Sequence, residues 1–416
     1  MIIFIILVTL IFLIINYVHF QKLANFSNFF MLMWCIVSVL SSFGFYGLYV
    51  PPTKAYSYIL LVMIMFGVSS LFLLRLKLNV NSEKTSFKLN WRKINIITAL
   101  CMIVLLPFSI KGAAIVMSEG FYRLRLSGFS ELLYSTNQKL LLMNIIQPLV
   151  LAISTLSLVE LVENKKVRLS LVISVFNCFL FILIFGGRWI LLEFVLLAGI
   201  ILYDIYGGSI SRLVKNNKLI MLLLSVIVLT IAIITLQRSV GGGDGLLYNI
   251  YIYFVGSIHL FGVYINNPVM YYLGSDYLLY GKEFFAGVLE PVFLAAKYIG
   301  LDWKSGVETI NEVTQQFVFV SPQTFMNNNV TMIYAFLRDF GVWGLFICPF
   351  LLGAIYAHMY KLKKIQPNIY RKSVYYFSLS IMPFLLFEWM PARMSIILVP
   401  FVLYFLTRKG FRMQKQ

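Results

Sequence analysis

The sequence predicts an all-α fold, a polytopic bundle of about eleven transmembrane helices with a large, partly helical external loop. Ten to twelve spans are compatible with the pattern. Of the 416 residues, 60% are hydrophobic and 12% are charged, against roughly 25% charged in soluble domains. The apolar runs are continuous rather than alternating, which favours helices over a closed barrel, because lipid leaves every backbone polar group to be satisfied internally.

The apolar runs divide the chain into spans and connections. We expect spans at residues 2–18, 27–49, 56–75, 94–117, 140–162, 169–187, 189–206, 219–237, 340–358, 374–390 and 394–407. Basic connections alternate between them, and the positive-inside tendency assigns these connections to the cytoplasm. This assignment makes the C-terminus cytoplasmic. It also attributes the net charge of +18 to topology rather than to nucleic-acid binding.

One connection is far longer than the others. Residues 238–339 separate the N-terminal spans, residues 1–237, from the last spans and the basic tail, residues 340–416. Such a loop is functional or disordered, and its content of Tyr, Phe, Leu and Ile argues for a folded external cap. We expect helices at 247–265, 284–299 and 305–317. The first could cross the membrane, but its polar residues favour a re-entrant or surface helix.

Cysteines and nucleotide motifs give no sign of a cofactor. Cys35, Cys101, Cys178 and Cys348 lie inside apolar runs without metal-ligand spacing, so we expect free buried thiols. The sequence contains no Gly-rich phosphate loop and no His-Glu-x-x-His motif. We therefore expect neither a metal nor a cofactor.

Four arginines stand at the expected external ends of spans, against the positive-inside tendency: Arg188, Arg238, Arg338 and Arg393. A single arginine there can reach lipid headgroups by extending its side chain. Four arginines at the same depth in the membrane, with no lysine among them, indicate that they bind a common ligand. The planar guanidinium binds phosphate oxygens in pairs, so this level predicts a site for a pyrophosphate or another polyanion.

Acidic residues lie near the same level. Glu193 and Glu388 sit inside apolar runs, where ionisable groups are costly and therefore candidates for function, and Asp339 follows Arg338. A structural alternative is ion pairing, either of Glu388 with Arg393 or of Glu193 with an arginine of another helix.

The cap supplies candidate bases and aromatic surfaces. His259, or a cap carboxylate such as Glu290, could deprotonate a hydroxyl group, although a lone histidine on an apolar helix is more often packed. Tyr272 and its neighbouring tyrosines suit the faces of sugars, and they suit an interfacial aromatic belt equally well.

Three strings carry a resemblance to a known family. Residues 185–193, Phe-Gly-Gly-Arg-Trp-Ile-Leu-Leu-Glu, resemble a Gly-Arg span start, and Gly199 follows Arg188 in an Arg-x10-Gly pattern. Residues 327–341, running into Gly344 and Gly353, resemble the entry to a late span. Over most of its length the chain resembles the Wzy-type O-antigen and capsule polymerases. It departs from them after Arg238, where Asn249 replaces the second glycine.

The resemblance implies a bacterial inner-membrane enzyme that moves a growing glycan from its undecaprenyl-pyrophosphate carrier onto the next lipid-linked repeat unit. Its partners would be that lipid-linked oligosaccharide, membrane lipids, a chain-length regulator and a flippase. We assign candidate catalytic roles to Arg188, Arg338, Asp339, His259 and Glu193. We assign candidate substrate-binding roles to Arg238, Arg393, Glu388, Glu290 and Tyr272.

Three other functions share parts of this pattern. A flippase for the lipid-linked unit would have a similar number of spans, but its charges should line a passage through the membrane centre. The ligase that moves finished glycan onto lipid A-core would share the fold and the arginines. A scaffold without chemistry would leave the arginine level unexplained.

Overall fold

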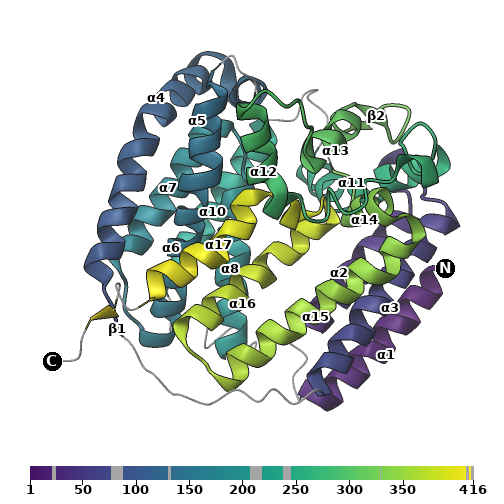
Figure 1. Cartoon of the computed structure of the whole chain (residues 1–416), viewed down its shortest axis with the longest axis horizontal. Coiled ribbons are helices and arrows are strands. Elements are labelled where there is room, and N and C mark those ends of the chain that lie inside the picture. The colour runs from purple at the N-terminus through teal and green to yellow at the C-terminus, as the bar shows by residue number, and fades with distance from the viewer. Residues whose placement is uncertain are drawn as a thin grey trace. The chain divides into compact units, whose positions relative to one another are not determined.

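The computed structural model describes residues 1–20, 25–75, 88–129, 133–206, 218–237, 245–327, 329–408 and 412–413. These residues are almost entirely helical, which confirms the predicted all-α fold (Figure 1). Strands occur among them only as two short antiparallel pairs. One joins β1 (Lys88–Leu89) to β4 (Arg412–Met413), and the other joins β2 (Val318–Phe319) to β3 (Phe325–Met326).

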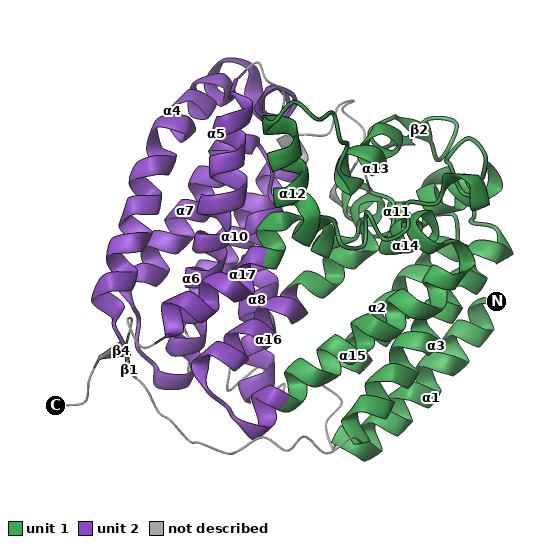
Figure 2. Cartoon of the chain, in the orientation of Figure 1, with its two compact units in different colours: residues 1–80, 247–361, 381–397 green, residues 81–246, 362–380, 398–416 purple. Residues whose placement is uncertain are grey.

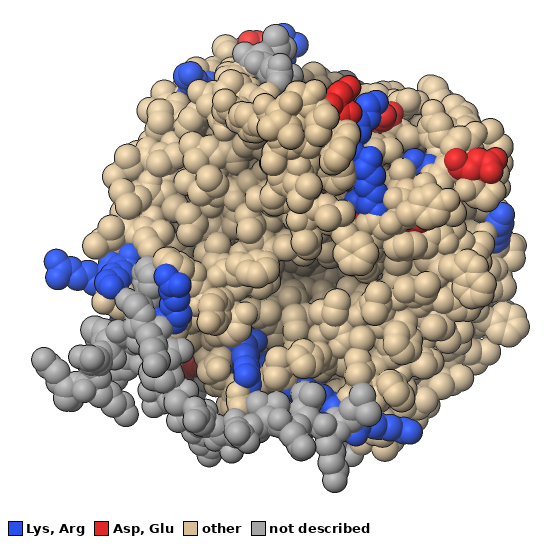
Figure 3. Space-filling model, viewed as in Figure 1, with Lys and Arg blue, Asp and Glu red and all other residues tan. Residues whose placement is uncertain are grey.

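Seven of the described helices are long and apolar enough to cross a membrane, as expected of a multi-pass membrane protein. They are Ile2–Phe20, Thr53–Arg75, Trp91–Gly128, Thr136–Asn164, Trp189–Tyr206, Leu247–Asn266 and Met332–Ile365. Four shorter apolar helices match further expected spans: Phe26–Ser42, Leu169–Phe185, Met221–Thr235 and Met394–Thr407. On the face shown in Figure 3, most of the described surface is uncharged.

The chain forms two compact units, each assembled from segments that are distant in sequence (Figure 2). Unit 1 comprises residues 1–80, 247–361 and 381–397, and unit 2 comprises residues 81–246, 362–380 and 398–416.

Unit 1 contains a group of neighbouring helices, α1 (Ile2–Phe20), α2 (Phe26–Ser42), α3 (Thr53–Arg75) and α15 (Gly344–Ile365) (Figure 1). The Asn16 side chain donates to Asn28 at 2.7 Å and so satisfies polar groups between α1 and α2. Gly353 brings α15 onto α3, since a Cβ there would lie 2.2 Å from Ser69. The expected span 27–49 stops early, because Gly44 adopts a left-handed backbone (φ +56°).

The second part of unit 1 is formed by α11 (Leu246–Asn266), α12 (Ala286–Tyr298), α13 (Gly306–Thr314) and α14 (Met332–Phe340). The first three confirm the helices expected within residues 238–339. Tyr251 donates to the Leu40 carbonyl at 3.0 Å, and Gly262 packs against Pro51. These contacts are eleven residues apart on α11, so the helix packs lengthwise against the end of α2 and the connection to α3.

Unit 2 is built on α4 (Trp91–Phe129), α6 (Gln147–Asn164), α7 (Leu169–Phe185), α8 (Trp189–Tyr206) and α10 (Lys218–Gln237). Further elements are α5 (Thr136–Leu141), η2 (Leu142–Ile146), α16 (Ile369–Ile381) and most of α17 (Met394–Thr407). Gly112 allows α4 to approach α7, because a Cβ there would lie 1.6 Å from the Leu183 carbonyl oxygen. The helix bends at Gly120 (φ +82°) and continues beyond the expected end at 117.

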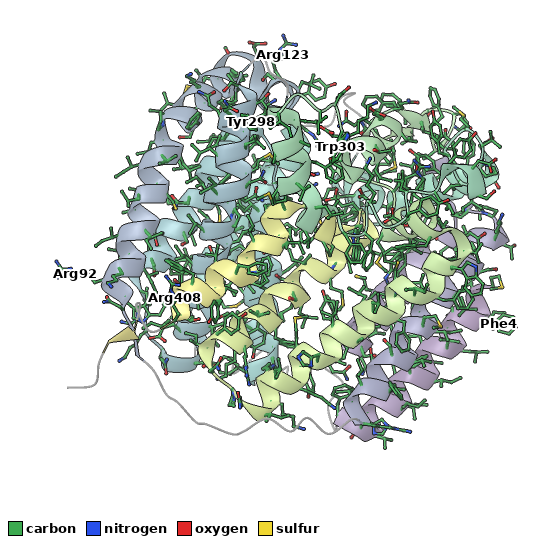
Figure 4. All side chains as sticks on the ribbon, viewed as in Figure 1. Phe4, Arg92, Arg123, Tyr298, Trp303 and Arg408 are labelled. Carbon is green, nitrogen blue, oxygen red and sulfur yellow. The ribbon has the colours of Figure 1, made fainter. Side chains whose placement is uncertain are left out.

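Basic connections gather at one end of unit 2. The Arg168 guanidinium lies 4.8 Å from the centre of the Trp91 ring, and Lys372 pairs with Glu163 at 2.7 Å. The β1–β4 pair joins the tail to the segment before α4. Arg92 and Arg408 lie at this end, whereas Arg123 lies at the other end of α4 (Figure 4). The grouping follows the pattern expected of cytoplasmic connections, and the side of the membrane stays a prediction.

Candidate functional site

In unit 1, the segment that leads into α12 is held by the last turn of α14. Leu279 donates its backbone N–H to the Arg338 carbonyl at 2.8 Å, and Tyr280 donates to the Asp339 carbonyl at 3.0 Å. The Asp339 side chain accepts the Glu283 N–H at 3.1 Å and the Phe284 N–H. Asp339 therefore places a carboxylate against otherwise unpaired N–H groups just before α12, where negative charge is stabilised.

Arg338 is directed at backbone carbonyls of the same segment. The side chain is only 4% exposed, and its Nη1 donates to the carbonyls of Tyr272 at 2.7 Å and Tyr277 at 2.8 Å. The guanidinium also lies 5.4 Å from the centre of the Tyr272 ring. Tyr272 and Tyr280 both have left-handed backbone angles, with φ of 55° and 52°, which costs about 1–2 kcal/mol per residue. In this structure Arg338 and Asp339 stabilise that strained segment.

Glu283 is the buried carboxyl of this site. It is 5% exposed, and its Oε2 has no hydrogen-bond partner among the described residues. Burial, together with the nearby carboxyls of Asp339, Glu388 and Glu290, raises the pKa of Glu283 to about 8. A carboxyl with a pKa in this range can both release and accept a proton near neutral pH.

Glu290 lies on α12 and is half-buried. Burial raises its pKa, while a hydrogen bond from Ser305 opposes that effect. Ser305 caps α13, and the next residue, Gly306, packs on the Lys282 carbonyl, from which a Cβ would be 2.2 Å away. The start of α13 therefore lies against the same segment as Glu283.

Two short 3-10 turns, η5 (Met382–Leu386) and η6 (Met390–Ala392), separate α16 from α17. The prediction of one continuous helix over 374–390 is therefore wrong. Proline occupies an early position of each turn, and it removes a helical hydrogen-bond donor. In this connection Trp389 donates its indole N–H to the Phe284 carbonyl at 2.9 Å, and the two rings stack at 4.8 Å.

The same connection carries an ion pair. Arg393 pairs with Glu388 at 2.6 Å, which confirms the predicted pairing, although the pair was expected to be buried. Their side chains are 36% and 34% exposed, so the pair is open to a ligand at its outer side. Gly287 of α12 holds the connection close, because a Cβ there would lie 2.3 Å from the Pro391 carbonyl oxygen. Arg393 and Glu283 therefore both lie next to the first turn of α12: Glu283 precedes it in sequence, and the Arg393 connection packs against it.

His259 makes its hydrogen bonds to Tyr49 and Tyr251. It is fully buried on α11, with Nδ1 2.9 Å from the Tyr49 carbonyl and Nε2 3.3 Å from the Tyr251 hydroxyl. Both ring nitrogens are engaged, so His259 fixes α11 to the α2–α3 connection. This geometry fits a packed histidine rather than a catalytic base.

Arg188 belongs to unit 2. It lies in the turn between α7 and α8, and its Nη1 donates to the Thr235 hydroxyl. Gly186 (φ +61°) lets this turn lie against the backbone of Arg125, only 3.0 Å from where a Cβ would stand. Arg125 and Arg188 are thus neighbours at one end of unit 2. Arg238 lies outside the described residues.

Glu193 is buried in α8, and neither of its carboxyl oxygens has a hydrogen-bond partner among the described residues. The prediction that it pairs with an arginine of another helix is therefore wrong for this part of the chain. All four cysteines are free, as predicted, but only Cys101, Cys178 and Cys348 are buried, whereas Cys35 is half-buried. Within the ranges that the structure describes, no group of three or more His, Cys, Asp or Glu residues could hold a metal ion.

Sequence reasoning selected Arg338, Asp339, Glu388 and Arg393, which the structure brings together in unit 1, but it did not single out Glu283. No local signal could have done so. The Glu283 N–H meets Asp339 across 56 residues of chain, and the neighbouring Phe284 meets Trp389 across 105.

No protein-family model matches the chain, and neither does any curated protein or solved structure. The resemblance to the polymerases therefore stays a prediction from the sequence.

Proposed function

We propose that the protein polymerises oligosaccharide repeat units linked to a polyprenyl pyrophosphate, at the outer face of the bacterial inner membrane. The proposal is supported by the arrangement of side chains around the first turn of α12 in unit 1. There a buried carboxyl that exchanges protons near neutral pH, Glu283, accompanies a partly exposed arginine, Arg393.

The reaction needs both groups. A hydroxyl of the acceptor repeat unit attacks the anomeric carbon of the donor glycan, and its proton passes to ionised Glu283. The bond between the anomeric carbon and the pyrophosphate oxygen breaks, and the electron pair leaves with the lipid pyrophosphate. Arg393 stabilises the charge on that oxygen, a contribution that is often the largest single catalytic effect. Glu388 orients Arg393 through their ion pair.

Other residues have supporting roles in this proposal. Arg338 and Asp339 position the 272–285 segment, so that Tyr272 offers an aromatic face to a sugar. In unit 2, Arg188 binds the pyrophosphate of a lipid-linked substrate. Both substrates of a polymerase carry such a group.

The first test is deletion of the gene in its host, followed by gel analysis of the surface glycan. We expect loss of the ladder with a single repeat unit still attached to its anchor, because flipping and ligation survive. Bare anchor would overturn the proposal. It would indicate a flippase if no lipid-linked glycan reaches the outer face, and a ligase if long lipid-linked chains accumulate there.

The second test uses the purified protein with a lipid-pyrophosphate-linked repeat unit. We expect Arg393→Ala to lower the rate about 10²–10³-fold, the loss found when one charge-stabilising donor is removed. Arg123→Ala is the matched control, because Arg123 is exposed and pairs with Glu119 of its own helix. Equal rates in the two variants would contradict the role of Arg393.

A further inference from the structure

Glu193 is the exception among the acidic residues of unit 2. Every other acidic side chain described in this unit is in an ion pair: Glu119 with Arg123, Glu160 with Arg168, Glu163 with Lys372 and Asp204 with Lys363. Glu193 is 1% exposed, and both of its carboxyl oxygens lack a hydrogen-bond partner among the described residues.

The described side chains around Glu193 supply no cation to it. Helices α6, α7 and α10 pack against α8. The titratable group beside Glu193 is Cys178 of α7, which shares a hydrogen bond with Ser154 of α6. On α6 the acidic residues Glu160 and Glu163 are paired elsewhere, and residues 221–235 of α10 contain no titratable side chain. Glu193 has no bond to Arg188, whose Nη1 bonds to Thr235.

An ionised carboxylate without a partner in a membrane core costs several kcal/mol, far more than its neutral form. We infer that Glu193 is a proton-binding site in the core of unit 2, with the proton as its ligand. The carboxyl is occupied by a proton at neutral pH and releases it when the pH rises or when α6, α7 and α8 separate.

Small polar groups are spaced along α7 between Cys178, beside Glu193, and one end of the unit. Ser170, Ser174 and Cys178 are spaced four residues apart and share one face of α7. The Ser170 hydroxyl lies 2.9 Å from the hydroxyl of Ser157 on α6, and the Ser174 hydroxyl is buried without a partner among the described residues. Hydroxyl groups both donate and accept, so this row suits proton exchange toward the end where Arg168 pairs with Glu160.

The inference does not depend on the proposed function, and it is tested on the full chain in detergent. Dicyclohexylcarbodiimide modifies protonated carboxyls in apolar surroundings, and peptide mass spectrometry locates the adduct. We expect adduct at Glu193 at neutral pH, with a rate that falls at least tenfold as the pH is raised. Glu160 and Glu163 should not react. Absence of the adduct at every pH, or a rate independent of pH, would overturn the proposal.

Infrared spectroscopy gives a readout that needs no reagent. The carbonyl stretch of a protonated carboxylic acid should be present in the wild type and in Glu163→Gln, and its intensity should drop in Glu193→Gln. Full retention of the band in Glu193→Gln would contradict a proton on Glu193. Protection from the carbodiimide by Na⁺ would also overturn the proposal, because the ligand would then be a metal cation.

Discussion

At the scale of single residues, the charge state of Glu283 affects the stability of unit 1 and, in the proposed function, its capacity as a base. The ordinary pKa is 4.5 and the folded-state pKa is about 8. The folded chain therefore holds a proton that the unfolded chain releases. The stabilisation associated with that proton is complete below pH 4.5, shrinks as the pH rises, and is lost above about 8.

Glu283→Gln should remove this pH dependence, because the amide resembles the protonated acid but cannot ionise. We expect the wild type to lose up to about 1.4 kcal/mol of stability per pH unit across that window, and the variant to lose less. Thermal unfolding in detergent between pH 5 and pH 8 measures the difference. Parallel curves for the two proteins would show that Glu283 does not titrate there.

Arg338 can be tested as a positioning residue. Arg338→Ala removes the hydrogen bonds to Tyr272 and Tyr277 and should cost about 3 kcal/mol. Arg338→Lys retains a cation near one carbonyl and should recover part of the stability and, with it, activity. Unfolding and KM for the lipid-linked substrate are measured together. A lysine variant with wild-type stability and a strongly raised KM would instead indicate direct contact with pyrophosphate.

Residue pairs close in sequence were the predictable ones. Glu388 and Arg393 stand five residues apart in one connection, so their pairing could be foreseen as an alternative. The role of Arg338 could not be foreseen, because the carbonyls that accept its hydrogen bonds lie 61 and 66 residues earlier in the chain. A guanidinium directed at carbonyls and one directed at phosphate look the same in a sequence.

At the scale of elements, glycine decides how closely the site segments approach. Gly287→Ala would place a methyl group 2.3 Å from the Pro391 carbonyl oxygen and 2.8 Å from Ile397. The connection must then move away from α12, and we expect a cost of about 1–3 kcal/mol, with reduced activity as Arg393 shifts.

Gly199→Ala is the matched control, since a Cβ there meets no atom within 4 Å. This variant should keep wild-type stability or gain slightly, because alanine favours helix by about 1 kcal/mol. Unfolding of both variants in detergent checks the pair. A larger loss at Gly199 than at Gly287 would mean that the Arg-x10-Gly pattern has a packing role that the structure does not show.

The positions where helices end are set by the backbone preferences of single residues, which a hydropathy profile does not show. The expected span 27–49 runs on through apolar residues, but Gly44 turns the chain after Ser42. The expected span 374–390 is equally apolar, and the prolines of η5 and η6 divide it. Hydropathy located the helices correctly because burial in lipid sets their composition, whereas single glycines and prolines set their limits.

At the scale of the whole molecule, the fold class was the most predictable property, because composition and run length follow directly from the bilayer. The division into units was not predictable. Residues 247–361 join 1–80, although 166 residues separate them, and no local pattern records a contact of that range.

The predicted topology can be tested by thiol labelling in spheroplasts. Trp303→Cys places a thiol in the connection between α12 and α13, where the native side chain is 53% exposed, and Lys166→Cys places one in a basic connection. We expect a membrane-impermeant maleimide to label the first in intact spheroplasts, and the second only after permeabilisation. Native thiols give little background, because three are buried and Cys35 is half-buried. The reverse pattern would invert the topology.

The discontinuity of unit 1 has a consequence for biosynthesis. A ribosome releases α1, α2 and α3 early, but their partners in residues 247–361 and 381–397 emerge only after residues 81–246 have been made. During that time the three helices are in the bilayer without the other helices of their unit. The Asn16 amide donates to both Ser27 and Asn28, so two hydrogen bonds already join α1 to α2 in the nascent chain before translation supplies the remaining helices.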